Sequence, residues 1–155
     1  MTALDDLGKQ LEGDLYFDET YRIIYSTDAS AYKEKPLAVV YPKHSKDLKL
    51  LIEFAHTRNT SLIPRGAGTS LACQVTGQGI VVDVSRYMNN IIALDKENKR
   101  VRVQPGLILS ELNDYLKSHG LMFGPETSTA NRCTLGGMLG NNACGLHSLR
   151  YGSTR

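Results

Sequence analysis

The chain carries the stretch Pro64-Arg65-Gly66-Ala67-Gly68-Thr69-Ser70-Leu71 directly after the apolar pair Leu62-Ile63. Its two glycines tolerate positive φ and leave backbone N–H groups uncovered, so the main chain can approach an anion closely. The hydroxyl residues after the second glycine add hydrogen-bond donors, and the arginine before the first adds positive charge. The stretch predicts a cradle for the phosphate of a cofactor; the simpler alternative is a tight connection between two strands.

The two commonest glycine loops do not fit this stretch. A P-loop needs a lysine after its second glycine to reach the β- and γ-phosphates, and no lysine follows Gly66 or Gly68 within the loop. The dinucleotide fingerprint Gly-x-Gly-x-x-Gly begins well, but Leu71 stands at the third glycine, where close helix–strand packing leaves no room for a side chain. Both an ATP or GTP site and a Rossmann unit are therefore disfavoured.

A second region, residues 125–152, is also rich in small residues, with glycines at 136, 137, 140 and 145. Little side-chain bulk there would let a flat or extended ligand lie close to the main chain. The polar side chains that could hydrogen-bond to such a ligand are Thr127, Ser128, Thr134, Asn141, Asn142 and Ser148. The alternative is a glycine-rich loop that only links two elements.

Together the two regions resemble the FAD-binding domain of FAD-linked oxidases, the family of the vanillyl-alcohol oxidase/PCMH-type flavoproteins. The nearest branch is the D-lactate dehydrogenase and glycolate oxidase D-subunit group. The resemblance runs from about residue 36 to residue 155. The motifs that carry it are residues 64–71, Pro125-Glu126-Thr127, Cys133-Thr134-Leu135-Gly136-Gly137, Asn141-Asn142 and Ser148-x-x-Tyr151-Gly152.

The resemblance implies an α+β fold: a PCMH-type domain of two α/β lobes with FAD between them. This domain would cover residues 36–155, incomplete at its C-terminal end, after a helical or irregular segment at 1–35. The implied cofactor-binding residues are Arg65, Gly66, Ala67, Gly68, Thr69 and Ser70 at the pyrophosphate, and Pro125, Thr127, Thr134, Gly137, Asn141, Gly145, Ser148 and Tyr151 along the rest. Some relatives attach FAD to a histidine where this chain has Thr69, so non-covalent FAD is expected.

The function implied by the resemblance is the N-terminal FAD-binding part of a dehydrogenase that oxidises a D-lactate- or glycolate-like 2-hydroxy acid by hydride transfer to flavin N5. Relatives continue into a substrate domain, so we expect a fragment that is inactive alone, with His147 structural rather than catalytic. Three alternatives stay open: part of a large flavoprotein with a C-terminal iron–sulfur domain, a non-catalytic FAD-dependent subunit, and a binder of another nucleotide.

Composition gives no support for a nucleic-acid partner or a membrane span, which leaves small molecules as the expected partners. The net charge is +2 and both signs are interspersed, so no basic stripe predicts nucleic-acid binding. Apolar runs are far shorter than the roughly 20 residues that span a bilayer, and charged residues interrupt the N-terminus, so a cytoplasmic protein is expected. Cys73, Cys133 and Cys144 lack metal-ligand spacing and are expected to be reduced thiols, with no metal site.

Hydrophobic spacing predicts the elements of the first half of the chain. A short helix over 2–12 buries Leu4, Leu7 and Leu11, whereas 16–30 is irregular or has one helical turn. Strands at 37–41 and 61–64 flank a helix over 45–59, which predicts that they pair in parallel with the glycine stretch at the carboxyl end of the second. In that helix Ser45 is the expected cap, and the expected buried stripe is Leu48, Leu51, Ile52 and Ala55.

The second half is expected to hold a strand at 79–84, a hairpin of 91–94 with 101–103, and a helix over 109–119. Leu112, Tyr115 and Leu116 should face inward from that helix, and Gly120 should end it. A short strand is expected at 121–123.

Overall fold

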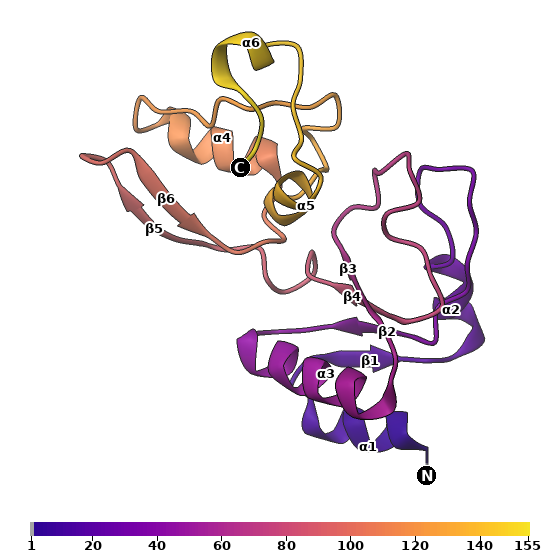
Figure 1. The fold of residues 1–155 in the computed structure, drawn as a ribbon. Coiled ribbons are helices and arrows are strands. Elements are labelled where there is room, and N and C mark those ends of the chain that lie inside the picture. The colour runs from indigo at the N-terminus through magenta and orange to yellow at the C-terminus, as the bar shows by residue number, and fades with distance from the viewer. Residues whose placement is uncertain (1) are drawn as a thin grey trace. The chain divides into compact units, whose positions relative to one another are not determined.

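The computed structural model describes residues 2–155 and divides the chain into two compact units, the first ending at Tyr87 and the second beginning at Met88 (Figure 1). Both units combine helices and strands, as an α+β fold requires. Among the described residues, no helix is both long enough and apolar enough to cross a bilayer.

A four-stranded sheet organises the first unit. Its strands are β1 (Asp14–Tyr16), β2 (Ala38–Tyr41), β3 (Leu62–Arg65) and β4 (Ile80–Asp83), in the order β1-β2-β4-β3. β4 pairs in parallel with both β2 and β3, and β1 pairs antiparallel with β2. The strands expected at 37–41, 61–64 and 79–84 are confirmed, but direct pairing of the first two is wrong. β4 lies between them, and every residue of β4 is buried, as suits an inner strand.

Helices α1 (Ala3–Gln10) and α3 (Ser45–Arg58) cover one face of this sheet (Figure 1). Successive strand residues point to opposite faces, so this face receives alternate residues of β2 and β4. The buried side chains between the helices and the sheet are Leu7, Leu11, Ala38, Val40, Leu51, Ile80 and Val82. The N-terminal helix expected at 2–12 is confirmed, and the Thr2 and Asp5 capping box fixes its start.

The start of α3 differs from expectation. His44, not Ser45, is its N-cap residue, and no side chain caps it. The buried carboxylate of Asp47 instead accepts the backbone N–H groups of Glu12, Gly13 and Lys43 at 3.1, 3.1 and 2.8 Å. Ile52 was wrongly placed in the buried stripe, since it is 60% exposed, and only Leu51 and Ala55 of that stripe are fully buried. The helix ends as expected at Asn59, whose φ is 50°.

Tyrosines line the opposite face of the sheet, where α2 (Glu19–Ile24) follows β1. The rings of Tyr16 and Tyr21 stack at 3.8 Å between centroids, and both meet Tyr41 edge-on. Residues 16–30 were expected to be irregular or to form one helical turn, and this was wrong for the first part of the segment. Tyr16 is the last residue of β1, and α2 is longer than one turn. β1 has only three residues, so alternation could not reveal it; its pairing with β2 is a tertiary interaction.

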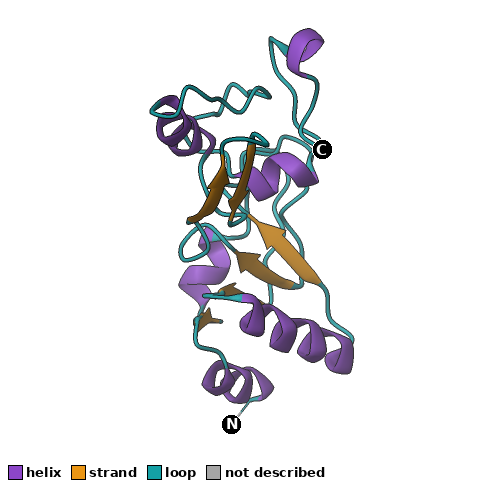
Figure 2. Cartoon of the chain, turned by 90° about the vertical axis from the view of Figure 1, so that its left-hand side faces the viewer, coloured by secondary structure: helices purple, strands orange, loops and turns teal. Residues whose placement is uncertain are grey.

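The second unit has a hairpin, three helices and long loops between them (Figure 2). The elements are β5 (Ile91–Asp95), β6 (Arg100–Val103), α4 (Leu109–Lys117), α5 (Leu135–Gly140) and α6 (Ser148–Tyr151). Its buried core consists of Leu107, Leu109, Leu112, Leu116, Cys133, Leu135, Met138 and Ala143. The hairpin and the helix expected at 109–119 are confirmed, but the helix ends at Lys117 with Ser118 as its C-cap, and Gly120, with φ +68°, lies in the turn that follows.

Two expectations for this unit were wrong. Tyr115 is 39% exposed and packs edge-on against the ring of His119 rather than into the core. Residues 121–123 form no strand, because the amide of Asn113 on α4 holds this backbone instead: its Oδ1 accepts the Phe123 N–H at 2.8 Å. A side chain thereby takes the place of a neighbouring strand.

Candidate functional site

The three parallel strands of the first unit end on polar side chains at the same edge of the sheet. Tyr41 is the last residue of β2, Arg65 of β3 and Asp83 of β4, and the last two are register partners. In open α/β sheets, ligands bind outside the carboxyl ends of parallel strands. The glycine stretch begins directly after Arg65, so it lies at this edge, as predicted.

The loop of residues 66–70 has main-chain donors that the protein does not use. Among the described residues, no backbone N–H from Gly66 to Ser70 donates a hydrogen bond to another protein group. Gly66 and Gly68 are also partly buried. N–H groups without a protein acceptor can donate to a ligand or to water. A run of such donors beside a polar strand edge fits an anionic ligand, as the sequence predicted.

Gly68 fixes the course of this loop. It has φ +66°, a conformation that favours glycine. Its carbonyl accepts the N–H of Ala29 at 3.1 Å, which ties the loop to the segment between α2 and β2, and Figure 1 shows the two loops side by side. The Ser70 hydroxyl contacts the side-chain oxygen of Gln74 further along the same loop.

The guanidinium of Arg65 lies over Gly68. A Cβ added to Gly68 would stand 2.6 Å from Nη2 of Arg65 and 3.0 Å from its Cζ. The same guanidinium lies 5.0 Å from the ring centroid of Tyr25, and its Nη1 donates to the carbonyl of Val75 at 3.4 Å. Arg65 therefore touches the interior side of its own loop rather than standing apart as a free charge.

Asp28 lies in the segment that is tied to this loop through Ala29. Burial raises the pKa of the Asp28 carboxyl, but hydrogen bonds from Ser30 and Val75 and the charge of Arg65 outweigh burial, so this pKa lies below its usual range. The N–H of Ser30 donates to Oδ1 of Asp28 at 2.8 Å. Residues 28–30 thus belong to the surroundings of the loop, a role the sequence did not assign.

Tyr25, Tyr41 and Asp83 form a hydrogen-bonded network behind Arg65. The Tyr25 hydroxyl donates to Oδ2 of Asp83 at 2.6 Å and lies 2.7 Å from the Tyr41 hydroxyl, while Ser85 donates to the other oxygen of Asp83. Burial and the hydrogen bond to Asp83 raise the pKa of Tyr25 far above its usual range. Sequence reasoning missed this network; an aspartate directly after the apolar run 80–82 was its available signal.

In the second unit, the structure brings together two parts of the predicted site, 124–127 and 145–151. A Cβ on Gly145 would stand 2.3 Å from the carbonyl oxygen of Glu126, and one on Gly124 would stand 2.8 Å from the ring of Tyr151. The Glu126 carboxylate also lies 2.6 Å from Nδ1 of His147. His147 therefore has a carboxylate neighbour within this unit.

Several predicted site residues of this unit already hold the fold. Thr134 is 2% exposed, and its hydroxyl caps α5 by accepting the Gly137 N–H at 3.3 Å. The Thr127 hydroxyl lies 3.2 Å from both Thr129 Oγ1 and Cys133 Sγ. Asn141 is the C-cap of α5 and Ser148 is the first residue of α6. Both short helices fall in a region that the sequence described only as small and polar.

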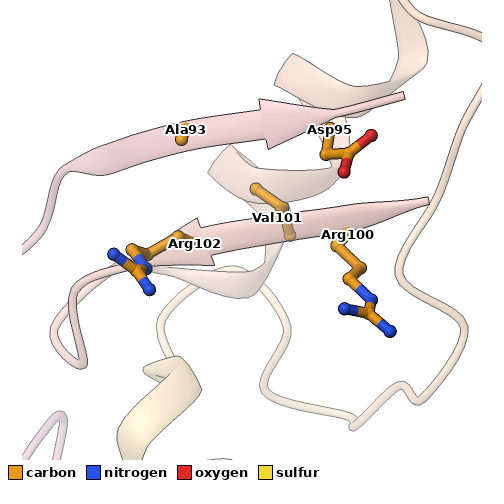
Figure 3. Close-up of a pocket in the computed structure, with 5 residues that line it drawn as sticks. All are labelled: Ala93, Asp95, Arg100, Val101 and Arg102. Carbon is orange, nitrogen blue, oxygen red and sulfur yellow. The ribbon is translucent and has the colours of Figure 1, made fainter. Parts of the chain in front are cut away.

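A hollow of about 280 Å³ lies on the hairpin, lined by Ala93, Asp95, Arg100, Val101 and Arg102 (Figure 3). None of these residues belongs to the predicted site. Hydrogen bonds from Asn98 lower the pKa of Asp95, so this carboxylate already has partners. Among residues 2–155 no cluster of three or more His, Cys, Asp or Glu side chains could hold a metal ion, and Cys73, Cys133 and Cys144 are free.

The described features define a class of protein: an α+β domain with a glycine-rich loop at the carboxyl ends of parallel strands, an arrangement that suits a nucleotide cofactor. The chain belongs to the FAD binding domain family, whose model matches residues 36–155. The predicted resemblance and the predicted cofactor, FAD, are thereby confirmed. The unused N–H groups of the loop and its left-handed glycine fit the diphosphate of FAD.

Individual relatives agree with this assignment. D-2-hydroxyglutarate dehydrogenase of Escherichia coli (strain K12) is 46% identical over 158 residues, covering 99% of this chain and 16% of that protein. Glycolate oxidase subunit GlcD of Bacillus subtilis (strain 168) is 34% identical over 152 residues, covering 94% of this chain and 32% of that protein. The chain therefore spans only a small part of the length of these relatives.

A solved structure shows the same fold. A variant of Physcomitrella patens BBE-like 1 aligns with a TM-score of 0.80 over 99% of this chain and 34% of that chain, at 18% sequence identity. The predicted fold class, an α+β PCMH-type FAD-binding domain, is confirmed.

Proposed function

We propose that this chain is the cofactor-binding part of a FAD-dependent oxidoreductase that oxidises a 2-hydroxy acid. The observation that carries the proposal is the loop of residues 66–70, with its run of N–H donors that lack protein acceptors at the strand edge. The substrate class follows from the names of the relatives, which act on 2-hydroxyglutarate and glycolate. Residues 36–155 are the proposed extent of the cofactor domain.

In this proposal the backbone of Arg65 to Ser70 binds the pyrophosphate, and Asp28, Tyr25 and Asp83 shape that loop from behind. The residues that line the rest of the cofactor are Pro125, Thr127, Thr134, Gly137, Asn141, Gly145, Ser148 and Tyr151. FAD, when bound, supplies at flavin N5 the acceptor for the hydride that leaves the hydroxy acid. The chain's own task is to bind the cofactor, orient it and exclude water.

Two sizes of enzyme are compatible with this function. The chain is more similar to the D-2-hydroxyglutarate dehydrogenase, of which it spans 16%, than to GlcD, of which it spans 32%. The higher identity favours the larger enzyme. If the whole protein is a large flavoprotein with an iron–sulfur domain, its full sequence should contain a cluster of cysteines outside these 155 residues. A glycolate oxidase-like enzyme should have no such cysteine cluster.

The test of FAD binding compares Gly68→Ala with Gly120→Ala. Both glycines have left-handed φ, +66° and +68°, but only Gly68 has neighbours at its missing Cβ; around Gly120 no heavy atom outside its chain neighbours comes within 4 Å. A displaced cradle should weaken FAD binding roughly 100-fold in Gly68→Ala, measured by flavin absorbance and fluorescence titration, and Gly120→Ala should bind like the parent.

Failure of the parent protein to bind FAD, or equal binding by both variants, would refute this site. Circular dichroism confirms that each variant is folded. Because Thr69 stands where some relatives have the histidine that bonds FAD, acid precipitation should leave the flavin in solution and the polypeptide colourless. Yellow colour on the pellet would contradict non-covalent binding.

A further inference from the structure

We propose that Arg65 is a positioning residue for the phosphate loop and not itself a phosphate ligand. The inference rests on the proposed function and assigns a role to one residue of that site. The side chain missing at Gly68 leaves a space, and the Arg65 guanidinium fills it, with Nη2 2.6 Å and Cζ 3.0 Å from where a Cβ would stand. Position 68 therefore needs a glycine to make room for the Arg65 guanidinium, in addition to any need to bring the backbone close to the ligand.

Three contacts fix the guanidinium in this place. The Tyr25 ring lies 5.0 Å from Cζ of Arg65, a distance at which a guanidinium interacts favourably with an aromatic face. Nη1 donates to the Val75 carbonyl at 3.4 Å, on the far side of the loop. The third contact is Gly68 itself, whose carbonyl is held by the Ala29 N–H. The guanidinium thus joins both ends of the segment 65–75.

The Tyr25 ring is itself held firmly. Its hydroxyl lies 2.6 Å from Asp83 Oδ2 and 2.7 Å from the Tyr41 hydroxyl, and these two residues end neighbouring strands. A chain of contacts therefore leads from the sheet through Tyr25 and Arg65 to Gly68. Through it the rigid strands set the conformation of the loop that contains the unused N–H groups.

With Arg65 as a support for the loop, the phosphates would be bound mainly by backbone N–H groups.

The decisive comparison is Arg65→Lys with Arg65→Gln. Lysine keeps the charge but has no planar group to lie on both the Tyr25 ring and Gly68. A positioning role predicts that both variants weaken FAD binding by about tenfold or more, and that both leave the dependence of the Kd on salt unchanged. If Arg65→Lys binds FAD like the parent while Arg65→Gln loses affinity and salt dependence, Arg65 is a ligand and the proposal is wrong.

Arg86→Lys is the matched control. The Arg86 guanidinium lies on the same face of the sheet, 5.0 and 5.3 Å from the rings of Tyr41 and Tyr87, and does not belong to the loop. The loss of a stacked arginine there should leave the FAD Kd unchanged. A loss equal to that of Arg65→Lys would show that general weakening of the first unit, not loop position, lowers affinity.

A double variant gives an independent readout. If Gly68→Ala acts by displacing the Arg65 guanidinium, combining it with Arg65→Gln should bind FAD no more weakly than the weaker single variant. Losses that multiply would mean that the two residues act separately, which overturns the proposal. Tyr25→Leu, which removes both the ring and the hydroxyl, should weaken FAD binding more than Tyr25→Phe, which keeps the ring under the Arg65 guanidinium but loses the hydrogen bonds to Tyr41 and Asp83.

Amide hydrogen exchange separates this inference from the proposed function, because it needs no cofactor. In the protein without FAD, Arg65→Lys and Arg65→Gln should both speed exchange of the Ala29 amide, which donates to the Gly68 carbonyl at 3.1 Å, and leave the amides of α3 protected. Unchanged exchange at Ala29 would refute the positioning role even if FAD binds. Faster exchange in a protein that does not bind FAD would instead refute only the proposed function.

Discussion

The two glycine-rich regions of this molecule need glycine for different structural reasons. At Gly68 in the first unit, the neighbour of the missing Cβ is a side chain, the Arg65 guanidinium, and the backbone is left-handed. At Gly136 and Gly145 in the second unit the nearest neighbours include the backbone of Pro105 and of Glu126. Glycine therefore makes room for an arginine side chain in one region, and in the other it lets two stretches of main chain approach each other closely.

The largest expected effect tests the scaffold role. Gly145→Ala would place a Cβ 2.3 Å from the Glu126 carbonyl oxygen, and because backbone cannot move aside cheaply, we expect a loss of about 3 kcal/mol in the free energy of unfolding. Urea denaturation measures it. Gly140→Ala is the control, since no heavy atom beyond its own helix turn and chain neighbours lies within 4 Å, and alanine suits a helix. Equal stability of the two variants would abolish the distinction between the regions.

A smaller effect should come from the hydroxyl that caps α5. Thr134→Val keeps the volume but removes the acceptor of the Gly137 N–H, which should cost about 1 kcal/mol of unfolding free energy. Thr154→Val is the matched control: Thr154 is also buried, in the same unit, and its hydroxyl has no hydrogen-bond partner among the described residues. We expect it to be neutral or slightly stabilising. A Thr134→Val protein as stable as the parent would show that the cap contributes little.

The smallest effect concerns the polar network of the first unit at high pH. Since the pKa of folded Tyr25 is raised, its contribution to stability is complete below the ordinary tyrosine pKa of about 10 and declines as pH rises above it. One such group can change the free energy of unfolding by at most about 0.7 kcal/mol between pH 10 and 10.5. Tyr25→Phe should therefore lose less stability than the parent over this range in urea titrations. If the parent and Tyr25→Phe lose the same free energy of unfolding over this pH range, the hydrogen bonds of the Tyr25 hydroxyl do not stabilise the fold.

Much of the fold followed from the sequence because its strongest signals are local. The apolar runs at 38–40 in β2 and 80–82 in β4, and the helix spacing of α1 and α4, are visible in the sequence. Strand order is different: β4 lies between β2 and β3 through tertiary pairing, which no single segment reveals. The same limit explains β1, which is defined by its pairing with β2, and Phe123, whose backbone bonds to the Asn113 side chain.

The position of the glycine-rich loop at the end of β3 was predictable, and the residues that support the loop were not. The composition of the segment Gly66 to Ser70 is sufficient to predict a ligand loop, and the family match identifies FAD as the cofactor. Tyr25, Asp28 and Asp83 lie up to 58 residues apart in contacts that only the folded sheet creates. The small residues of 134–148 looked like a ligand surface, but Thr134 and Gly145 also serve the interior, because a short capped helix and a close backbone crossing require them.

The buried carboxylate of Asp47 has a practical consequence. The family match starts at Pro36, yet two of the three N–H donors to Asp47, from Glu12 and Gly13, come from before that point, as do β1 and the packed leucines of α1. A polypeptide that starts at Pro36 would expose one edge of β2 and the apolar surface of α3 that packs with α1. Because an exposed strand edge can pair with another chain, the residues before Pro36 are expected to protect the domain from aggregation.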